Sequence, residues 1–189
     1  MNALLSRFGR FGSTVLLQVL VQTLILVWMV AGRVMILRSH DVVTLQSEPV
    51  DPRDLFRGDY VILSYAISSL SFTEINGDMK WRDGETVYVE VTPSKETWRA
   101  VAAFHNAVVP AVGNKIIRGR INYLDDTRNI ANVNYGIERY YVPEGEGRAL
   151  EEKRNERALS VDVALAGSGE AAIKGIRIDG VPIYEEPLF

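Results

Sequence analysis

The sequence contains no cysteine, and this absence removes several kinds of chemistry at once. Disulfide bonds, cysteine-containing zinc sites and cysteine nucleophiles are all excluded. Histidine is scarce as well, because only His40 and His105 are present and their separation does not match a metal-ligand motif. Both are therefore interpreted as structural polar residues. We expect no bound metal, no cofactor and no catalytic residue.

Acidic residues are missing from the first 40 positions, where the charged residues are Arg7, Arg10, Arg33 and Arg38. After residue 39 the balance reverses, with 17 Lys and Arg against 24 Asp and Glu, a net charge of −7. An acidic domain argues against nucleic acid as a partner, because phosphates favour basic surfaces. It argues equally against adsorption onto anionic lipid.

Charge is missing altogether from residue 11 to residue 32, a run of 22 residues that is mostly Val, Leu and Ile. A helix of about 20 such residues crosses a hydrocarbon core of about 30 Å, so the run predicts one membrane-spanning helix. A cleaved signal peptide is the alternative, but its apolar region is shorter and ends in small residues. Trp28 and Met29 stand here instead, so an uncleaved signal anchor fits better.

The expected domain organisation follows from this anchor. Residues 1–38 form an N-terminal tail and the anchor, and residues 39–189 form one domain long enough for a core of its own. The arginines and the free amine of the short tail favour a cytoplasmic N-terminus, although Arg33 and Arg38 compete on the other side. We therefore expect the domain on the extracytoplasmic side.

Two glutamines interrupt the apolar run. Gln18 and Gln22 share one helix face with Thr14, because the three recur every four residues. Amides in lipid tend to find partners on a neighbouring helix, so Gln18 and Gln22 are candidates for a transmembrane interface. The alternative is that Thr14 and Gln18 lie near the headgroups and are hydrated. Gln22 is deeper and is the better interface candidate.

The rest of the chain alternates between short β-type runs and turn residues. Strands are expected over residues 41–46, 59–65, 85–92, 98–105, 115–124, 130–135, 159–165, 171–178 and 181–184. One short helix is expected over residues 147–156, with charges so dense that most of it must face water. This spacing predicts a mainly antiparallel sheet curled as a barrel or a sandwich, after one transmembrane helix.

The densest stretch is residues 49–65, PVDPRDLFRGDYVILSY, which ends in an alternating strand. Alternation places Val61, Leu63 and Tyr65 on one face and Tyr60 on the other. We expect Leu63 and Tyr65 in the core and Tyr60 nearer a surface or partner.

The segment GDYVILSY, Gly58 to Tyr65, resembles the signature of the GDYXXLXY family of bacterial membrane-anchored proteins at all five fixed positions. The leading apolar helix, the PVDPRDLFRGDY run and the stretch YGIERYYVPEGEG at residues 135–147 also resemble family features. The resemblance implies an inner-membrane protein with a periplasmic domain and a larger, multi-span membrane protein as its partner. The resemblance brings no known activity with it.

One group of charged and aromatic residues remains as a candidate site. Its members come from the signature region and the later family stretch: Asp51, Arg53, Gly58, Asp59, Tyr60, Leu63, Tyr65, Glu138, Tyr140 and Glu144. They either brace the fold, for example through a bidentate Arg53–carboxylate pair, or form a recognition surface. Both interpretations stay open from the sequence.

Three functions are compatible with these features. The first is an interaction or assembly component of the envelope, paired with a membrane protein or with a second copy. The second is a binding module for a peptide or a glycan. A hydrolase is the weakest, since a serine–lysine chemistry such as that of type I signal peptidases has no serine between Ser47 and Ser64 to use.

Overall fold

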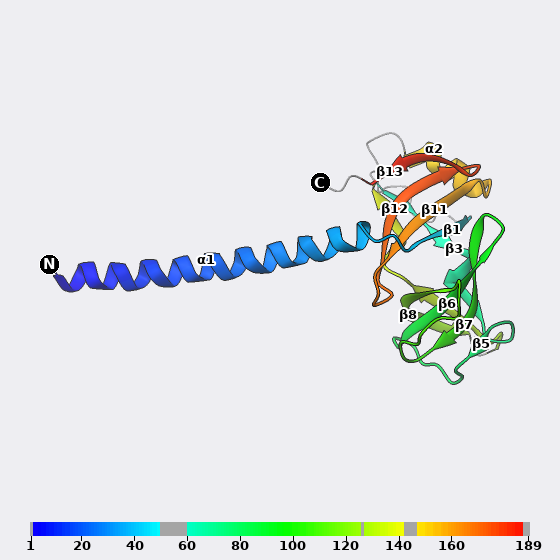
Figure 1. Cartoon of the computed structure of the whole chain (residues 1–189), viewed down its shortest axis with the longest axis horizontal. Coiled ribbons are helices and arrows are strands. Elements are labelled where there is room, and N and C mark those ends of the chain that lie inside the picture. Colours follow the sequence, from blue (N-terminus) through cyan, green and yellow to red (C-terminus); the bar gives the residue numbers. More distant parts are fainter. Residues whose placement is uncertain (1, 50–59, 126, 142–146, 187–189) are drawn as a thin grey trace. The chain divides into compact units, whose positions relative to one another are not determined.

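A computed structural model of the chain describes residues 2–49, 60–125, 127–141 and 147–186, without the side chains of residues 2–11, 13, 60 and 147–149. It divides into two compact units, residues 1–35 and residues 36–189. The first belongs to α1 (Asn2–Leu37), drawn in blue in Figure 1. Within α1, Thr14–Leu37 is long and apolar enough to cross a membrane. Its large side chains from Val15 to Val30 are exposed.

The second unit is mainly β (Figure 1). One sheet has five strands in the order β13 (Val181–Glu185), β12 (Ala171–Ile178), β11 (Leu159–Leu165), β1 (Val42–Glu48) and β3 (Ser64–Tyr65). All its pairings are antiparallel. This sheet joins β1 to the last three strands of the chain. Its register therefore depends on contacts between residues that are far apart in the sequence.

A second sheet has six strands in the order β4 (Ser69–Ser71), β9 (Ile130–Asn134), β8 (Lys115–Asp125), β6 (Thr86–Ser94), β7 (Thr97–Phe104) and β5 (Asn76–Gly77). Only the short β5–β7 pairing is parallel among the strands described. Two strands, β2 (Tyr60–Ile62) and β10 (Arg139–Tyr141), form a separate ribbon. The helical elements of this unit are η1 (Ala66–Ser68) and α2 (Gly147–Asn155).

One hydrophobic core joins the sheets. Alternate residues of β1, among them Val43 and Leu45, pack with Val87 and Val89 of β6 and with Val161 of β11. Period-two burial in these strands is what their alternating sequences predict. The predicted class, a mainly antiparallel and curled β fold with one short helix, preceded by a helix of membrane length, is confirmed.

Candidate functional site

The two stretches that resemble family features meet as one ribbon. β2 comes from the signature and β10 from the later stretch, and they pair antiparallel with Tyr140 opposite Val61 and Arg139 opposite Ile62. The pairing continues past the ribbon, because the Leu63 backbone N–H donates to the Glu138 carbonyl oxygen at 2.8 Å. We call β2 and β10 together the signature ribbon.

The inward face of this ribbon belongs to the core. Val61 and Tyr140 lie opposite each other and are both buried, and Leu63 and Tyr65 follow as buried residues on the same side. This agrees with the alternation predicted for Val61, Leu63 and Tyr65. The side chain of Tyr60 is not described, but the backbone of Tyr60 pairs with Tyr141, whose side chain is 70% exposed.

Two buried tyrosines tie the signature to the β9–β10 connection. The Tyr65 hydroxyl donates to the Ile137 carbonyl oxygen at 2.6 Å, and the Tyr135 hydroxyl donates to the Ile67 carbonyl oxygen at 2.7 Å. Residues 65–67 thus supply one donor, the Tyr65 hydroxyl, and one acceptor, the Ile67 carbonyl. Residues 135–137 supply the other donor and the other acceptor. Burial, helped by the negative charge of Glu138, raises the pKa of both phenols well above the ordinary value.

Glu138 has a bracing contact of its own. One oxygen of its carboxylate accepts a hydrogen bond from the Tyr135 backbone N–H, which closes the turn that leads from β9 into β10. Gly136 lies inside this turn with a φ of +79°, a left-handed conformation that favours glycine. The local sequence Tyr-Gly-Ile-Glu therefore sets where β10 begins.

A glycine in β8 makes room for the Tyr135 ring. A Cβ added to Gly119 would lie 2.4 Å from Val133 Cγ1 and 2.9 Å from two ring carbons of Tyr135. These separations are shorter than van der Waals contact, so a larger residue would displace the ring and its hydroxyl. The absence of a side chain at Gly119 is thus needed for the observed position of the Tyr135 ring.

The sequence analysis missed Arg154 of α2, which is 1% exposed. Its Nη1 donates to the Ile62 carbonyl oxygen at 2.6 Å, and its Nε and Nη2 donate to Asn155 Oδ1 at 3.2 and 3.1 Å. The expectation that the charges of this helix mostly face water does not hold for Arg154. The position of an apolar residue could have indicated this burial. Leu150 packs against the core and lies four residues before Arg154, on the same face of the helix.

The outward face of the signature ribbon is exposed and partly apolar. It carries Ile62, Arg139 and Tyr141. β13 meets the ribbon through the inward side, since the rings of Tyr140 and Tyr184 meet edge to face with centroids 5.5 Å apart. β13 is the outer strand of the described five-stranded sheet and exposes Val181, Ile183 and Tyr184. Tyr and Arg are residue types enriched at the centres of protein–protein interfaces.

The predicted site residues therefore divide into two groups. Leu63, Tyr65, Glu138 and Tyr140, together with the backbone of Tyr60, are brought together at the ribbon. Asp51, Arg53, Gly58, Asp59 and Glu144 lie outside the described residues. Whether the whole set braces the fold or recognises a partner stays a prediction. Gln18 and Gln22 are exposed on α1.

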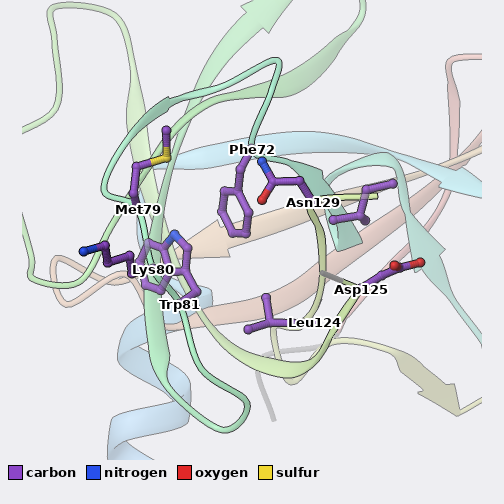
Figure 2. A pocket seen from close by; sticks show the side chains of 8 residues that line it. Phe72, Met79, Lys80, Trp81, Leu124, Asp125 and Asn129 are labelled. Atoms are coloured by element: carbon purple, nitrogen blue, oxygen red, sulfur yellow. The ribbon is translucent and has the colours of Figure 1, made fainter. Parts of the chain in front are cut away.

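A small pocket of about 100 Å³ opens at the six-stranded sheet. Figure 2 shows Phe72, Trp81 and Leu124 at its wall, with Lys80, Asp125 and Asn129 around it. Asp125 Oδ1 accepts from the backbone N–H groups of Thr127 and Arg128, so this carboxylate closes a turn. Among its described lining residues there is no second carboxylate that an acid–base hydrolase would need.

A larger polar groove of about 460 Å³ lies at the five-stranded sheet. Thr44, Gln46, Ser160 and Arg177 contribute to its lining. Gln46 Nε2 donates to the carbonyl oxygens of Arg157 and Leu159, and Arg177 Nε donates to Asp162 Oδ2 at 2.7 Å. Two of the side chains that line the groove, Gln46 and Arg177, are thus held in place by hydrogen bonds.

His105 contacts the ring of Trp81 and the carboxylate of Asp78. Its ring stacks on Trp81 with centroids 3.8 Å apart, and its Nδ1 lies 3.0 Å from Asp78 Oδ2. Hydrogen bonds from the His105 backbone N–H and ring hold the pKa of Asp78 below its usual value. Within the described part of the chain, no group of three or more His, Cys, Asp or Glu residues is placed to hold a metal ion.

Comparison with known proteins places the chain in a family. The family model described as GDYXXLXY protein matches residues 22–176, a range that includes both strands of the signature ribbon and α2. No curated protein and no solved structure matches the chain.

Proposed function

The chain belongs to the GDYXXLXY family, and from this premise we propose that it is an inner-membrane-anchored envelope protein whose β domain binds a membrane-protein partner. The observation that carries the proposal is the outward face of the signature ribbon. The family stretches build a braced ribbon that buries one face and leaves Ile62, Arg139 and Tyr141 exposed on the other. Extensive bracing on the buried side presents this exposed face in one conformation, which lowers the ordering cost of binding.

Anchoring is supported by α1. Its stretch Thr14–Leu37 matches the length that a bilayer core requires, and its large apolar side chains are exposed. A signal anchor with the N-terminus inside places residues 39–189 outside the cytoplasm, as one domain, in the periplasm. The arginines that precede the span support this orientation.

The partner we propose is a larger, multi-span membrane protein, with a second copy of this chain as the competing possibility. Gln18 and Gln22 supply a candidate contact within the bilayer, where side-chain amides hydrogen-bond across helices. The exposed ribbon supplies the contact outside it. An inert tether would need neither feature, since Leu or Val would serve at every position of the span.

Co-purification tests this proposal. Full-length protein extracted in mild detergent is expected to retain one membrane protein in a fixed ratio, and Tyr141→Ser is expected to reduce that ratio severalfold. Tyr123→Ser is the matched control, because Tyr123 is a tyrosine with 54% exposure in β8, which belongs to the six-stranded sheet and not to the ribbon. Equal retention by both variants would contradict a contact through the ribbon.

A second candidate function is a binding module for a peptide or a glycan. The polar groove with Thr44, Gln46 and Ser160 favours it, because its size and its fixed hydrogen-bonding groups suit an extended polar ligand. Titration of the domain with envelope peptides and glycan fragments separates the two functions. Saturable binding that a groove substitution such as Thr44→Val abolishes, with partner retention unchanged, would favour the module.

A further inference from the structure

The loop that connects β7 to β8, residues 105–114, holds the two most exposed large apolar residues that the structure describes, Val109 and Val112. Its sequence HNAVVPAVGN carries no carboxylate, lysine or arginine. Val109 is 95% exposed and Val112 is fully exposed, and Val108 is exposed as well. Three valines held in water without a covering element are unfavourable, since each would gain free energy by leaving water.

The loop is held in this conformation by a buried carboxylate. Glu90 of β6, which is 9% exposed, accepts hydrogen bonds through Oε1 from the Ala111 backbone N–H at 2.8 Å and from Asn114 Nδ2 at 2.7 Å. The Asn114 backbone N–H also donates to the Ala111 carbonyl oxygen at 2.9 Å. The valines therefore point outward from a braced loop.

The base of this loop lies beside the point where the chain leaves the anchor. Lys115, the residue after the loop, forms an ion pair with Asp41. Asp41 follows Leu37, the last residue of the candidate span, by only four residues. Four residues reach at most about 14 Å, so chain length alone keeps Lys115 near the end of the span.

The maximum separation of about 14 Å between Leu37 and Asp41 can be compared with the thickness of the headgroup layer. The hydrocarbon core is about 30 Å thick and the whole bilayer about 40–45 Å, which leaves about 5–8 Å of headgroups on each side. An apolar loop next to Lys115 is thus within reach of the interface, where apolar side chains are favoured over water. A loop at the far end of β8 would be about 33 Å further along that strand.

Charge neither drives nor prevents such a contact. The basic residues at the base of the loop are paired, Lys115 with Asp41 and Arg118 with Glu170. The Glu90 carboxylate beneath the loop is buried and hydrogen-bonded to the loop itself. Attraction of the loop to a bilayer would come from the valines.

We propose that residues 107–112 are a membrane-interface loop, in which Val108, Val109 and Val112 insert into the headgroup region of the bilayer that holds α1. This inference rests on the proposed anchoring and adds a second, non-covalent contact of the domain with lipid. Two contacts would restrain the tilt of the domain relative to the bilayer. A partner bound through the signature ribbon would then meet a domain of fixed orientation.

The absence of cysteine permits a direct test, because a single introduced cysteine is labelled uniquely. Full-length Val109→Cys and Val112→Cys, labelled with an environment-sensitive nitrobenzoxadiazole dye, are reconstituted in phosphatidylcholine vesicles. Thr127→Cys is the control, because Thr127 is exposed in the turn beyond the opposite end of β8. We expect a blue-shifted emission that headgroup-region spin-labelled lipid quenches severalfold for the two loop positions. The Thr127 label keeps the emission that it has in water.

Extraction at alkaline pH separates failure of the inference from failure of the anchor. Protein that stays with the vesicles while the loop labels keep an aqueous, unquenched emission would overturn the inference and leave the anchoring intact. A blue shift that lipid does not quench would also overturn it, since it shows that protein covers the loop. Protein released by alkaline extraction would show instead that the anchor proposal is wrong, and the inference with it.

Discussion

At the scale of single residues, two signature positions, Leu63 and Tyr65, are explained by what their side chains touch. Leu63 and Tyr65 are in the core, and the Tyr65 hydroxyl satisfies the Ile137 carbonyl oxygen. Alternation was enough to predict that Leu63 and Tyr65 are buried, because strand periodicity depends on local sequence only. The hydroxyl's partner could not be predicted, because Ile137 is far along the chain and only the folded register brings it to Tyr65.

Tyr65→Phe tests this hydrogen bond. The variant keeps the ring in the core but leaves the buried Ile137 carbonyl oxygen without this donor. We expect the free energy of unfolding of residues 36–189 to fall by about 1–3 kcal/mol in chemical denaturation. Tyr123→Phe removes an exposed hydroxyl and should change it by less than about 0.5 kcal/mol. Equal effects would show that the Tyr65 hydroxyl contributes nothing specific.

Alkaline pH tests the same residues by ionisation. The pKa values of Tyr65 and Tyr135 are raised in the folded state, so above the unfolded value of about 10 the folded protein binds more protons than the unfolded one. Their contribution is complete below about pH 10 and is lost as the pH rises through the folded pKa values. The slope is about 1.4 kcal/mol per pH unit for each tyrosine.

The measurement is the free energy of unfolding of residues 36–189 between pH 9 and pH 11. Tyr65→Phe and Tyr135→Phe together should flatten the decline relative to the unmodified domain, because other groups titrate equally in both proteins. Parallel curves would mean that these two phenols ionise as freely in the folded state as in the unfolded state.

At the scale of elements, the longer strands were predictable and their partners were not. Runs such as residues 85–92 and 115–124 alternate clearly and became β6 and β8. Nothing in the sequence indicates that β1 pairs with β11, since sheet order depends on contacts far apart in the chain. Arg154 was missed because a helix rich in charge is typical of a solvated surface. Its burial beneath β2 depends on tertiary packing.

Arg154→Met tests whether α2 holds the signature ribbon. Methionine keeps a long apolar stem but removes the donor to the Ile62 carbonyl oxygen and those to Asn155. We expect the domain to lose about 1–3 kcal/mol of stability, with β2 becoming less protected in hydrogen exchange. Lys153→Met is the control on the same helix, since it breaks only an exposed pair with Glu156. Equal protection of β2 in both variants would contradict a fixing role for Arg154.

At the scale of the whole molecule, the chain combines a helix of membrane length with a β domain, which we propose lies outside the cytoplasm. The uncharged run predicts the membrane helix, because membrane insertion depends on length and hydropathy rather than on tertiary contacts. The residues after the run are then expected to form the domain. Orientation depends on a small difference between two pairs of arginines, and a partner depends on a surface that only the folded ribbon creates.

A reporter fused after Phe189 tests the orientation. A reporter that is active only outside the cytoplasm should be active, because the N-terminal arginines keep the tail inside. A cytoplasmic reporter at the same position should be silent. The reverse pair of results would place the domain in the cytoplasm and remove the periplasmic part of the proposal.

The central claim is that the outward face of the signature ribbon contacts a membrane-protein partner, and photo-crosslinking in intact membranes tests it most directly. A photoreactive phenylalanine analogue replaces Tyr141 in one variant and Tyr123 in the other, both exposed aromatic positions of the same domain. The account predicts a discrete adduct with one membrane protein, or with a second copy of the chain, from position 141 and none from position 123. No adduct from position 141, or the same adducts from both positions, would contradict it.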